Sequence, residues 1–95
     1  MKLARQVFDI ELAALRSVKG SLDESFDRGI DLICATLAAR RKIVVLGVGK
    51  SGNIGRKIAA TLSSTGSTAV VLNPVDALHG DLGIVQDGDL ILALR

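Results

Sequence analysis

The sequence is poor in aromatic residues, cysteine and proline, and each shortage excludes a class of protein. Two phenylalanines, with no tryptophan or tyrosine, provide no aromatic platform on which single-stranded nucleic acid could stack. Cys34 is the single cysteine, so an intramolecular disulfide and a cysteine-based zinc cluster are both excluded. A chain with so little cysteine fits a reducing compartment. Ten glycines against one proline indicate tight backbone turns rather than a low-complexity linker.

A strong excess of charge and a long apolar run are also missing. The net charge is +2, and the one basic run, Arg40–Lys42, is interpreted as a solvated helix end. No apolar segment approaches the roughly 20 residues that a membrane span requires. The N-terminus begins an amphipathic pattern instead of the apolar core of a signal peptide. We therefore expect a cytoplasmic protein that contacts neither nucleic acid nor membrane.

Hydrophobic residues make up 48% of the 95 positions, which is enough for a small folded core. In residues 1–40 they recur every three or four positions, which predicts two amphipathic helices. Gly20 is expected to end the first helix, and Ser21 with Glu24 to form a capping box that starts the second. The apolar positions are Leu3, Val7, Ile10, Ala14 and Val18 in the first helix, and Leu22, Phe26, Ile30, Ile33 and Leu37 in the second.

Short β-branched runs replace the helical period in residues 41–95. They predict buried strands at 43–46, 69–72 and 90–94. Between the first two strands a helix is expected from Asn53, with Gly66 at its C-terminal cap. Asn73-Pro74 ends the second strand, and residues 75–89 are expected to form a loop with one helical turn. Strands that alternate with helices predict an α/β fold with a three-layer, Rossmann-like parallel sheet.

The first strand is followed by GVGKSG, Gly47–Gly52, the strongest motif in the chain. Glycines allow a sharp turn and a close approach of the backbone to a ligand. The helix that follows offers unpaired N–H groups and a partial positive charge, which together suit an anion such as phosphate. Lys50 adds a full charge and Ser51 a hydroxyl. We therefore predict that Gly49, Lys50 and Ser51 contact an anionic ligand.

Other interpretations of this loop are weaker. A Walker A loop requires a glycine where the chain has the strand residues Val44 and Val45. The dinucleotide pattern G-x-G-x-x-G is matched literally, but its ribose-binding acid, expected about 20 residues on, is replaced by Asn73. Close helix–sheet packing alone is a third role for the glycines, but a lysine and a serine within the same loop favour a ligand.

The second strand is followed by a polar loop that contains His79, the single histidine. Ligands bind at the carboxyl ends of strands in open parallel sheets, and both loops leave from that edge. This placement favours a functional role for His79. Asp81 would either orient the His79 ring or cap a turn. One histidine cannot form a metal site alone.

The segments GVGKSGNIGRKIAATLSSTG (residues 47–66) and LNPVDALHGDLG (residues 72–83) carry a family resemblance. They resemble the sugar isomerase (SIS) domain of the arabinose-5-phosphate isomerase family, over the whole length of the chain. Those enzymes interconvert ribulose 5-phosphate and arabinose 5-phosphate for the synthesis of 3-deoxy-manno-octulosonate, a component of lipopolysaccharide or capsule. The resemblance implies an SIS-type fold, a sugar-phosphate ligand, no cofactor, and a homo-oligomer (a tetramer in the family).

The resemblance also implies roles for particular residues. Lys50 matches a lysine implicated in catalysis, and His79 matches a substrate-contacting histidine. Gly66 and Ser67 match a pair that contacts the substrate. Some members carry a histidine that binds an inhibitory metal at the position of Asn73, so an asparagine there removes support for that metal site.

Length is the main departure from the family pattern. In the family the domain continues into a serine-rich phosphate loop and further catalytic glutamates and a histidine, so we expect residues 1–95 to be the N-terminal part of one SIS domain, helical over 1–40 and α/β over 41–95. We expect such a chain to be inactive alone and to self-associate through its apolar surfaces. The alternative is a non-catalytic module that senses sugar phosphates, like the SIS domains of some transcription regulators.

Overall fold

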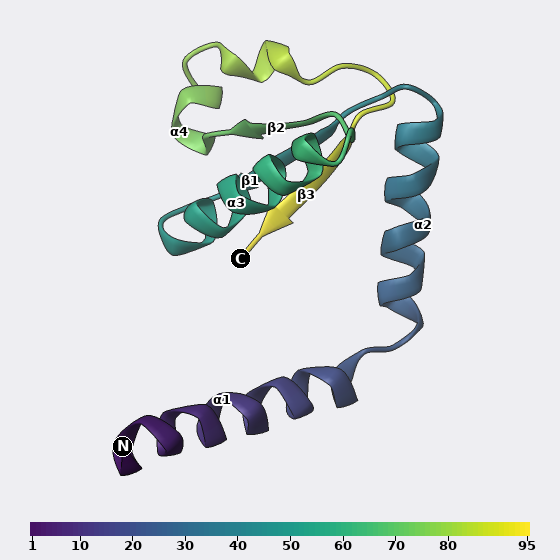
Figure 1. Cartoon of the computed structure of the whole chain (residues 1–95). Helices are drawn as coiled ribbons and strands as arrows, with labels where there is room; N and C mark the ends of the chain where they lie inside the picture. The colour runs from purple at the N-terminus through teal and green to yellow at the C-terminus, as the bar shows by residue number, and fades with distance from the viewer. The chain divides into compact units, whose positions relative to one another are not determined.

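The computed structural model describes all 95 residues and contains five helices and three strands (Figure 1). Their contacts divide the chain into two compact units, Met1–Ile30 and Asp31–Arg95. In chain order the elements are α1 (Lys2–Ser21), α2 (Glu24–Ala38), β1 (Ile43–Gly47), α3 (Lys50–Ser64), β2 (Ala69–Leu72), α4 (Pro74–Ala77), the 3-10 helix η1 (Asp81–Ile84) and β3 (Leu90–Leu94).

The first unit consists of α1 and the beginning of α2, and both helices were predicted. The predicted boundary between them is wrong, because Gly20 and Ser21 lie inside α1. The Ser21 hydroxyl donates back to the Val18 carbonyl at 2.7 Å and therefore does not cap the next helix. Asp23, the residue before α2, is the cap instead: its carboxylate accepts from the Ser25 backbone N–H at 2.9 Å. Hydrogen bonds from Ser25 also lower the pKa of Asp23.

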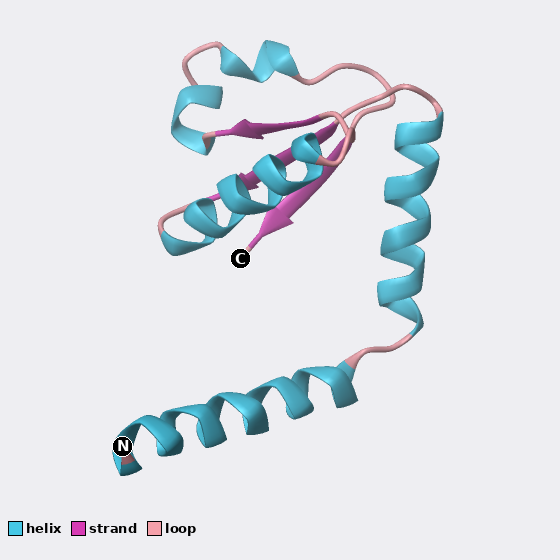
Figure 2. Cartoon of the chain, viewed as in Figure 1, coloured by secondary structure: helices cyan, strands magenta, loops and turns pink.

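The second unit contains a parallel sheet of three strands in the order β2-β1-β3 (Figure 2). Ile43 of β1 is in register with Ala69 of β2 on one side and with Leu90 of β3 on the other. All three predicted strands are confirmed, as is the α/β parallel architecture. Since β1 lies between the other two strands, the loop that follows it leaves from the middle of the sheet.

The core of this unit forms around β1 and one face of α3. Ile43, Val44 and Val45 have no exposed surface, as expected of a central strand covered on both faces. Ala59 of α3 is buried against Ile43 and Val45, and Gly55 lets the helix approach so closely that a Cβ there would lie 3.0 Å from a Val45 methyl carbon. The partly buried residues packed around this centre are Ile33, Leu37, Ala69, Leu90, Leu92 and Leu94.

Helices α2 and α3 end in the same backbone motif with different residues. Gly66, predicted as the cap of α3, has φ +88°, and the N–H of Ser67 donates to the Leu62 carbonyl at 2.9 Å. At the end of α2 the equivalent left-handed position is Arg40, with φ +59°. The Arg41 N–H donates to the Thr36 carbonyl at 3.0 Å there. Both patterns are Schellman motifs, and glycine is the residue that adopts them without strain.

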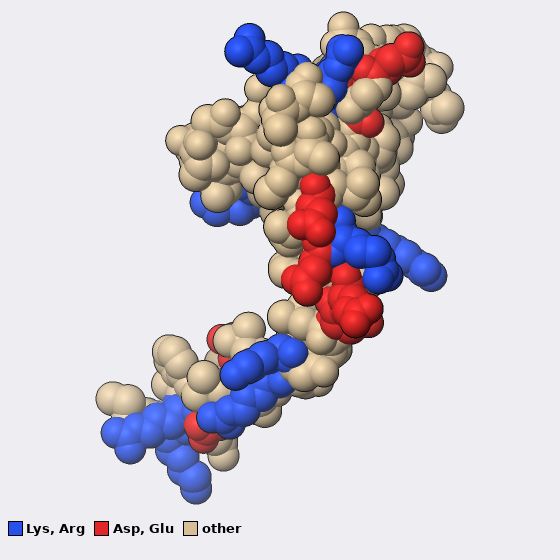
Figure 3. All heavy atoms as spheres, turned by 90° about the vertical axis from the view of Figure 1, so that its right-hand side faces the viewer, with Lys and Arg blue, Asp and Glu red and all other residues tan.

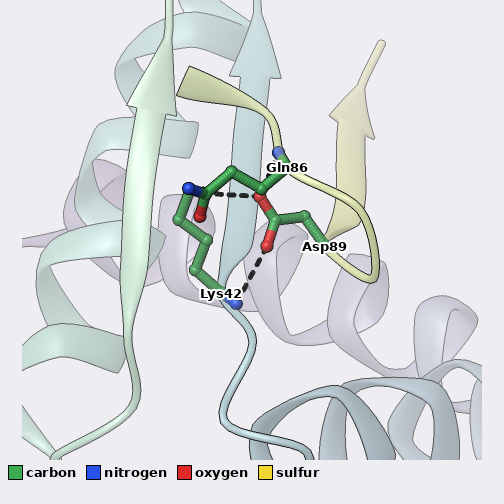
Figure 4. A network of polar contacts seen from close by, with 3 residues as sticks. All are labelled: Lys42, Gln86 and Asp89. Carbon is green, nitrogen blue, oxygen red and sulfur yellow. Dashed lines mark hydrogen bonds and ion pairs between the residues drawn. The ribbon is translucent and has the colours of Figure 1, made fainter. Parts of the chain in front are cut away.

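A nearly buried ion pair closes the amino edge of the sheet (Figure 4). Lys42 Nζ lies 2.5 Å from Asp89 Oδ2, and the two side chains are 14% and 1% exposed. Asp89 also accepts from the Gln86 N–H at 2.8 Å, while Lys42 donates to the Gln86 side chain at 3.1 Å. These contacts, led by the Lys42 hydrogen bond, hold the pKa of Asp89 below its ordinary value. They fix the loop before β3 to the residue before β1.

Candidate functional site

The carboxyl edge of the sheet brings together the two loops that the sequence marks as functional. Leu46 and Leu72 are paired between β1 and β2. The next residues, Gly47 and Asn73, therefore leave from neighbouring positions, with the strands about 4.8 Å apart. One leads into α3 and the other into α4. In open parallel sheets this edge is where ligands bind.

The loop after β1 is a turn with no space for side chains at two of its glycines. A Cβ on Gly47 would lie 2.9 Å from the Ser51 carbonyl atoms, and a Cβ on Gly52 would lie 2.8 Å from the Gly47 oxygen. Gly49 has φ +62° and is the N-cap of α3, without a side-chain hydrogen bond. The helix therefore begins at Lys50, three residues earlier than the predicted start at Asn53. The close Gly47–Gly52 contact explains this early start, because it folds the chain directly into the helix.

The early start places Lys50 and Ser51 in the first turn of α3, where backbone N–H groups have no helical acceptor. Lys50 is exposed and Ser51 is half-buried. Neither side chain makes a hydrogen bond or an ion pair within the chain. The partial positive charge of a helix N-terminus thus coincides with a free ammonium and a free hydroxyl, which is the arrangement that favours a phosphate.

Arg56 adds a second cation to this turn, which the sequence reasoning did not single out. Its guanidinium donates to the Asn53 side chain, and one of its nitrogens lies 3.9 Å from the place that a Cβ on Gly52 would occupy. The spacing from Gly52 to Arg56, one helical turn, could have indicated this placement, because long side chains on a helix lie back toward its N-terminus. Arg56 forms no ion pair with an acidic residue.

The loop after β2 is organised by Asn73. Its side-chain oxygen accepts from the Val75 N–H at 2.8 Å and so caps α4, with Pro74 in the first helical position. His79 follows α4 and is exposed, with its backbone N–H bonded to the Asp76 carbonyl at 2.9 Å. No hydrogen bond joins Asp81 to His79; Asp81 instead begins η1. The His79 ring is therefore available to a ligand at the same edge as Lys50.

Gly66 and Ser67 lie elsewhere. They connect the end of α3 to the start of β2, at the amino edge of the sheet, where Thr68 bonds to Ile43 at 2.9 Å. A strand length of roughly 15 Å separates them from the glycine turn. They help to line a surface hollow of about 270 Å³ with Ser63, Thr68 and Ala69. Gly49, Lys50 and Ser51 thus lie in the turn at the carboxyl edge, and His79 lies in the loop that leaves β2 at that edge, whereas Gly66 and Ser67 lie at the amino edge.

No group of three or more His, Cys, Asp or Glu side chains lies close enough to hold a metal ion. The Asn73 oxygen is already engaged in its cap. None of the helices combines the length and apolarity that crossing a membrane would require.

Curated relatives align with nearly the whole chain. Arabinose 5-phosphate isomerase GutQ of Escherichia coli K12 is 42% identical over 92 residues, which are 97% of this chain and 28% of that protein. Arabinose 5-phosphate isomerase KdsD of Francisella tularensis is 36% identical over 91 residues, 96% of this chain and 28% of the relative. The chain thus spans about 28% of the length of these curated relatives.

Solved structures and a family profile agree with that alignment. A crystal structure from Bacteroides fragilis, assigned as a phosphosugar isomerase involved in capsule formation, superposes with a TM-score of 0.82 at 32% identity, covering 96% of this chain and 48% of that one. A protein of Escherichia coli CFT073 in complex with arabinose 5-phosphate gives a TM-score of 0.75 at 34% identity, covering 97% and 49%. The SIS domain profile matches residues 36–95. With its glycine turn, parallel sheet and polar second loop, this chain belongs to the SIS domain family.

Proposed function

We propose that this chain forms the sugar-phosphate-binding part of an aldose–ketose isomerase that interconverts arabinose 5-phosphate and ribulose 5-phosphate. The observation that carries the proposal is the first turn of α3, where free backbone N–H groups, Lys50 and Ser51 lie at the carboxyl edge of the sheet. An anion bound there gains from the helix dipole and from charge-assisted hydrogen bonds. The identity of the arabinose 5-phosphate isomerases over the same residues supports this choice of sugar.

The reaction requires a proton to move between C1 and C2 of the sugar through an enediol. A negative charge develops on the sugar oxygen as the proton leaves, and a nearby ammonium stabilises it. Lys50 is exposed at this edge and has no internal partner, so it serves that role in our proposal. His79, with a free ring on the neighbouring loop, contacts the sugar. Gly49 and Ser51 shape and line the same site.

The base is the part of the machinery for which these residues offer no good candidate. Asp76 and Asp81 are the carboxylates closest to His79 in the sequence, and neither is hydrogen-bonded to the His79 ring. Proton transfer needs a base within hydrogen-bonding reach of the C1 or C2 proton. We therefore expect the 95 residues alone to bind arabinose 5-phosphate and to convert very little of it.

Binding is tested by titrating the chain with arabinose 5-phosphate and following backbone amide NMR signals. We expect the largest shifts at Gly49, Lys50, Ser51 and His79. Lys50→Gln should weaken binding about tenfold to a hundredfold, the value of one charge-assisted hydrogen bond. Lys57→Gln, an exposed lysine further along α3, is the matched control and should change little. Equal affinity for arabinose without phosphate, or shifts confined to Gly66 and Ser67, would contradict the proposed site.

Catalysis is tested in a chimera in which this chain replaces the matching 92 residues of Escherichia coli GutQ. We expect the chimera to form ribulose 5-phosphate from arabinose 5-phosphate, and Lys50→Ala to reduce turnover far more than it reduces the melting temperature. A chimera that folds and binds arabinose 5-phosphate but never converts it would favour the alternative, a sensing module without catalysis.

A further inference from the structure

Helix α3 carries positive charges with no negative charge of its own to balance them. Its 15 residues include Lys50, Arg56 and Lys57 and neither Asp nor Glu. Acidic side chains gather on another helix, and Figure 3 shows a group of them over α2. Cations near a helix N-terminus are disfavoured by the helix dipole, whereas an anion is favoured there. The charges at the start of α3 therefore cost stability and favour an anionic ligand.

The Arg56 side chain lies back along α3 toward the turn after β1. One guanidinium nitrogen is 3.9 Å from the place that a Cβ on Gly52 would occupy, and another donates to the Asn53 side chain. The same Cβ position is 2.8 Å from the Gly47 oxygen, so the guanidinium lies close to the end of β1. A charge that belongs to the second turn of the helix is thereby brought to the first turn.

Most of the N–H donors of Arg56 have no acceptor within the chain. The guanidinium makes its one hydrogen bond to Asn53, forms no ion pair, and belongs to an exposed residue. A planar guanidinium presents two parallel N–H groups to a phosphate, which the ammonium of a lysine cannot do. The bond to Asn53 therefore limits the orientation of this fork while its other donors stay free for a ligand.

Arg56 lies on the flank of α3 that faces β2. Ser63 follows it two turns further along on the same face of the helix, and the Ser63 hydroxyl donates to the Ala69 carbonyl of β2 at 3.1 Å. On the other flank, a Cβ on Gly55 would lie 3.4 Å from a Leu94 methyl carbon of β3. Since the second polar loop continues from β2 at the carboxyl edge, Arg56 lies on the side of the glycine turn toward that loop.

We propose that Arg56 holds the phosphate of the sugar phosphate and so determines specificity for a phosphorylated sugar. This inference rests on the proposed function and assigns two cations to different parts of one ligand. Arg56 pairs with phosphate oxygens on the flank toward β2, while Lys50, at the first position of α3, faces the sugar oxygen that gains charge in the reaction. A phosphate monoester carries about two negative charges at neutral pH, which a guanidinium and the helix N–H groups together can balance.

The test titrates the unmodified chain and Arg56→Gln with inorganic phosphate, arabinose 5-phosphate and arabinose. We expect Arg56→Gln to weaken binding of both phosphates by the same factor, about tenfold to a hundredfold, and to leave the affinity for arabinose unchanged. The NMR signal of the Arg56 Nε–H group should shift as inorganic phosphate is added. Arg56→Lys, which keeps the charge but loses the fork, should show an intermediate loss.

Lys57→Gln is the matched control, because it removes the same charge one residue further along α3. It should change phosphate affinity little, and the melting temperatures of all these chains should agree, since both side chains are exposed. Full affinity in Arg56→Lys would overturn the two-point contact. Equal losses in Arg56→Gln and Lys57→Gln would overturn the specific role of Arg56.

The outcomes also separate this inference from the proposed function on which it rests. A chain that does not bind arabinose 5-phosphate would overturn both. Binding that Lys50→Gln weakens and Arg56→Gln leaves intact would overturn the role of Arg56 alone. So would an Arg56→Gln variant that loses affinity for arabinose 5-phosphate and none for inorganic phosphate, because the guanidinium would then contact the sugar.

Discussion

The two edges of the β2-β1-β3 sheet use their polar side chains in opposite ways. At the amino edge, Lys42 and Asp89 satisfy each other and Gln86, and almost none of the Asp89 side chain meets solvent. At the carboxyl edge, Lys50, Ser51 and the His79 ring make no hydrogen bond within the chain. The first edge uses its charges to hold two segments together, whereas the second keeps them free for a ligand.

This contrast separates residues by the kind of failure that their substitution should cause. A change at the amino edge should lower stability while leaving sugar-phosphate affinity unchanged in the molecules that remain folded. A change in the side chains of the carboxyl edge should lower sugar-phosphate affinity and leave stability unchanged, because those side chains are exposed or half-buried. The glycines of the carboxyl turn are the exception, since they support both the backbone and the site.

Gly52→Ala is expected to have the largest effect of the substitutions considered. The added Cβ would meet the Gly47 oxygen at 2.8 Å, and a contact with backbone leaves little room for adjustment. We expect a loss of about 3 kcal/mol in urea unfolding, the upper range for overpacking, together with loss of ligand binding. Gly29→Ala in α2, which meets nothing within 4 Å, is the control and should be neutral or stabilising. A stable, fully binding Gly52→Ala would show that the turn can rearrange.

Asp89→Asn should lower the melting temperature clearly and leave arabinose 5-phosphate affinity intact. The substitution removes the counterion of Lys42 in a largely enclosed position. The pH dependence gives a sharper test. Folding lowers the pKa of Asp89. Its contribution to the free energy of unfolding is therefore complete above the unfolded pKa, near 3.9, and is lost as the pH falls through the lower pKa of the folded chain. The difference in melting temperature between the unmodified chain and Asp89→Asn should therefore shrink below about pH 3.9. A difference that stays constant with pH would contradict the role of ionisation.

Gly66→Ala should cost about 1–2 kcal/mol, because alanine is strained at φ +88°. Urea unfolding measures this loss. No atom lies within 4 Å of the place that a Cβ on Gly66 would occupy, so backbone strain alone causes the loss. Unchanged stability would imply that the end of α3 unwinds at little cost.

Arg40→Gly should have the smallest effect, and in the opposite direction. It removes a side chain from a left-handed position at φ +59°, but it also adds freedom to the unfolded chain. The net gain should be about 0.5 kcal/mol in urea unfolding. A loss of stability would show that the Arg40 side chain contributes more than its backbone strain costs.

The sequence predicted the structure correctly where neighbouring residues in the chain determine it. Runs such as Ile43–Leu46 predicted all three strands, and Gly66 was identified as a cap. The prediction that Ser21 caps α2 was wrong because two residues compete for that role. The Ser21 hydroxyl donates to the Val18 carbonyl within α1, and Asp23 caps α2. The partnership of Lys42 with Asp89, 47 positions away, leaves no local signal. The separation of Ser67 from Lys50 could have been predicted from the sequence. Ser67 precedes a strand and Lys50 follows one, and in a parallel sheet these positions lie at opposite edges.

The central position of β1 also has a consequence for the order in which the sheet assembles. Ile43 must find Ala69, 26 residues on, and Leu90, 47 residues on. The longer closure costs about 0.5 kcal/mol more in chain entropy, and only the shorter one is bridged by α3, whose hydrogen bonds are local. We therefore expect β1, α3 and β2 to form the folding nucleus and β3 to join it afterwards. Substitutions at Val71 would then slow refolding, whereas substitutions at Leu92 would mainly speed unfolding.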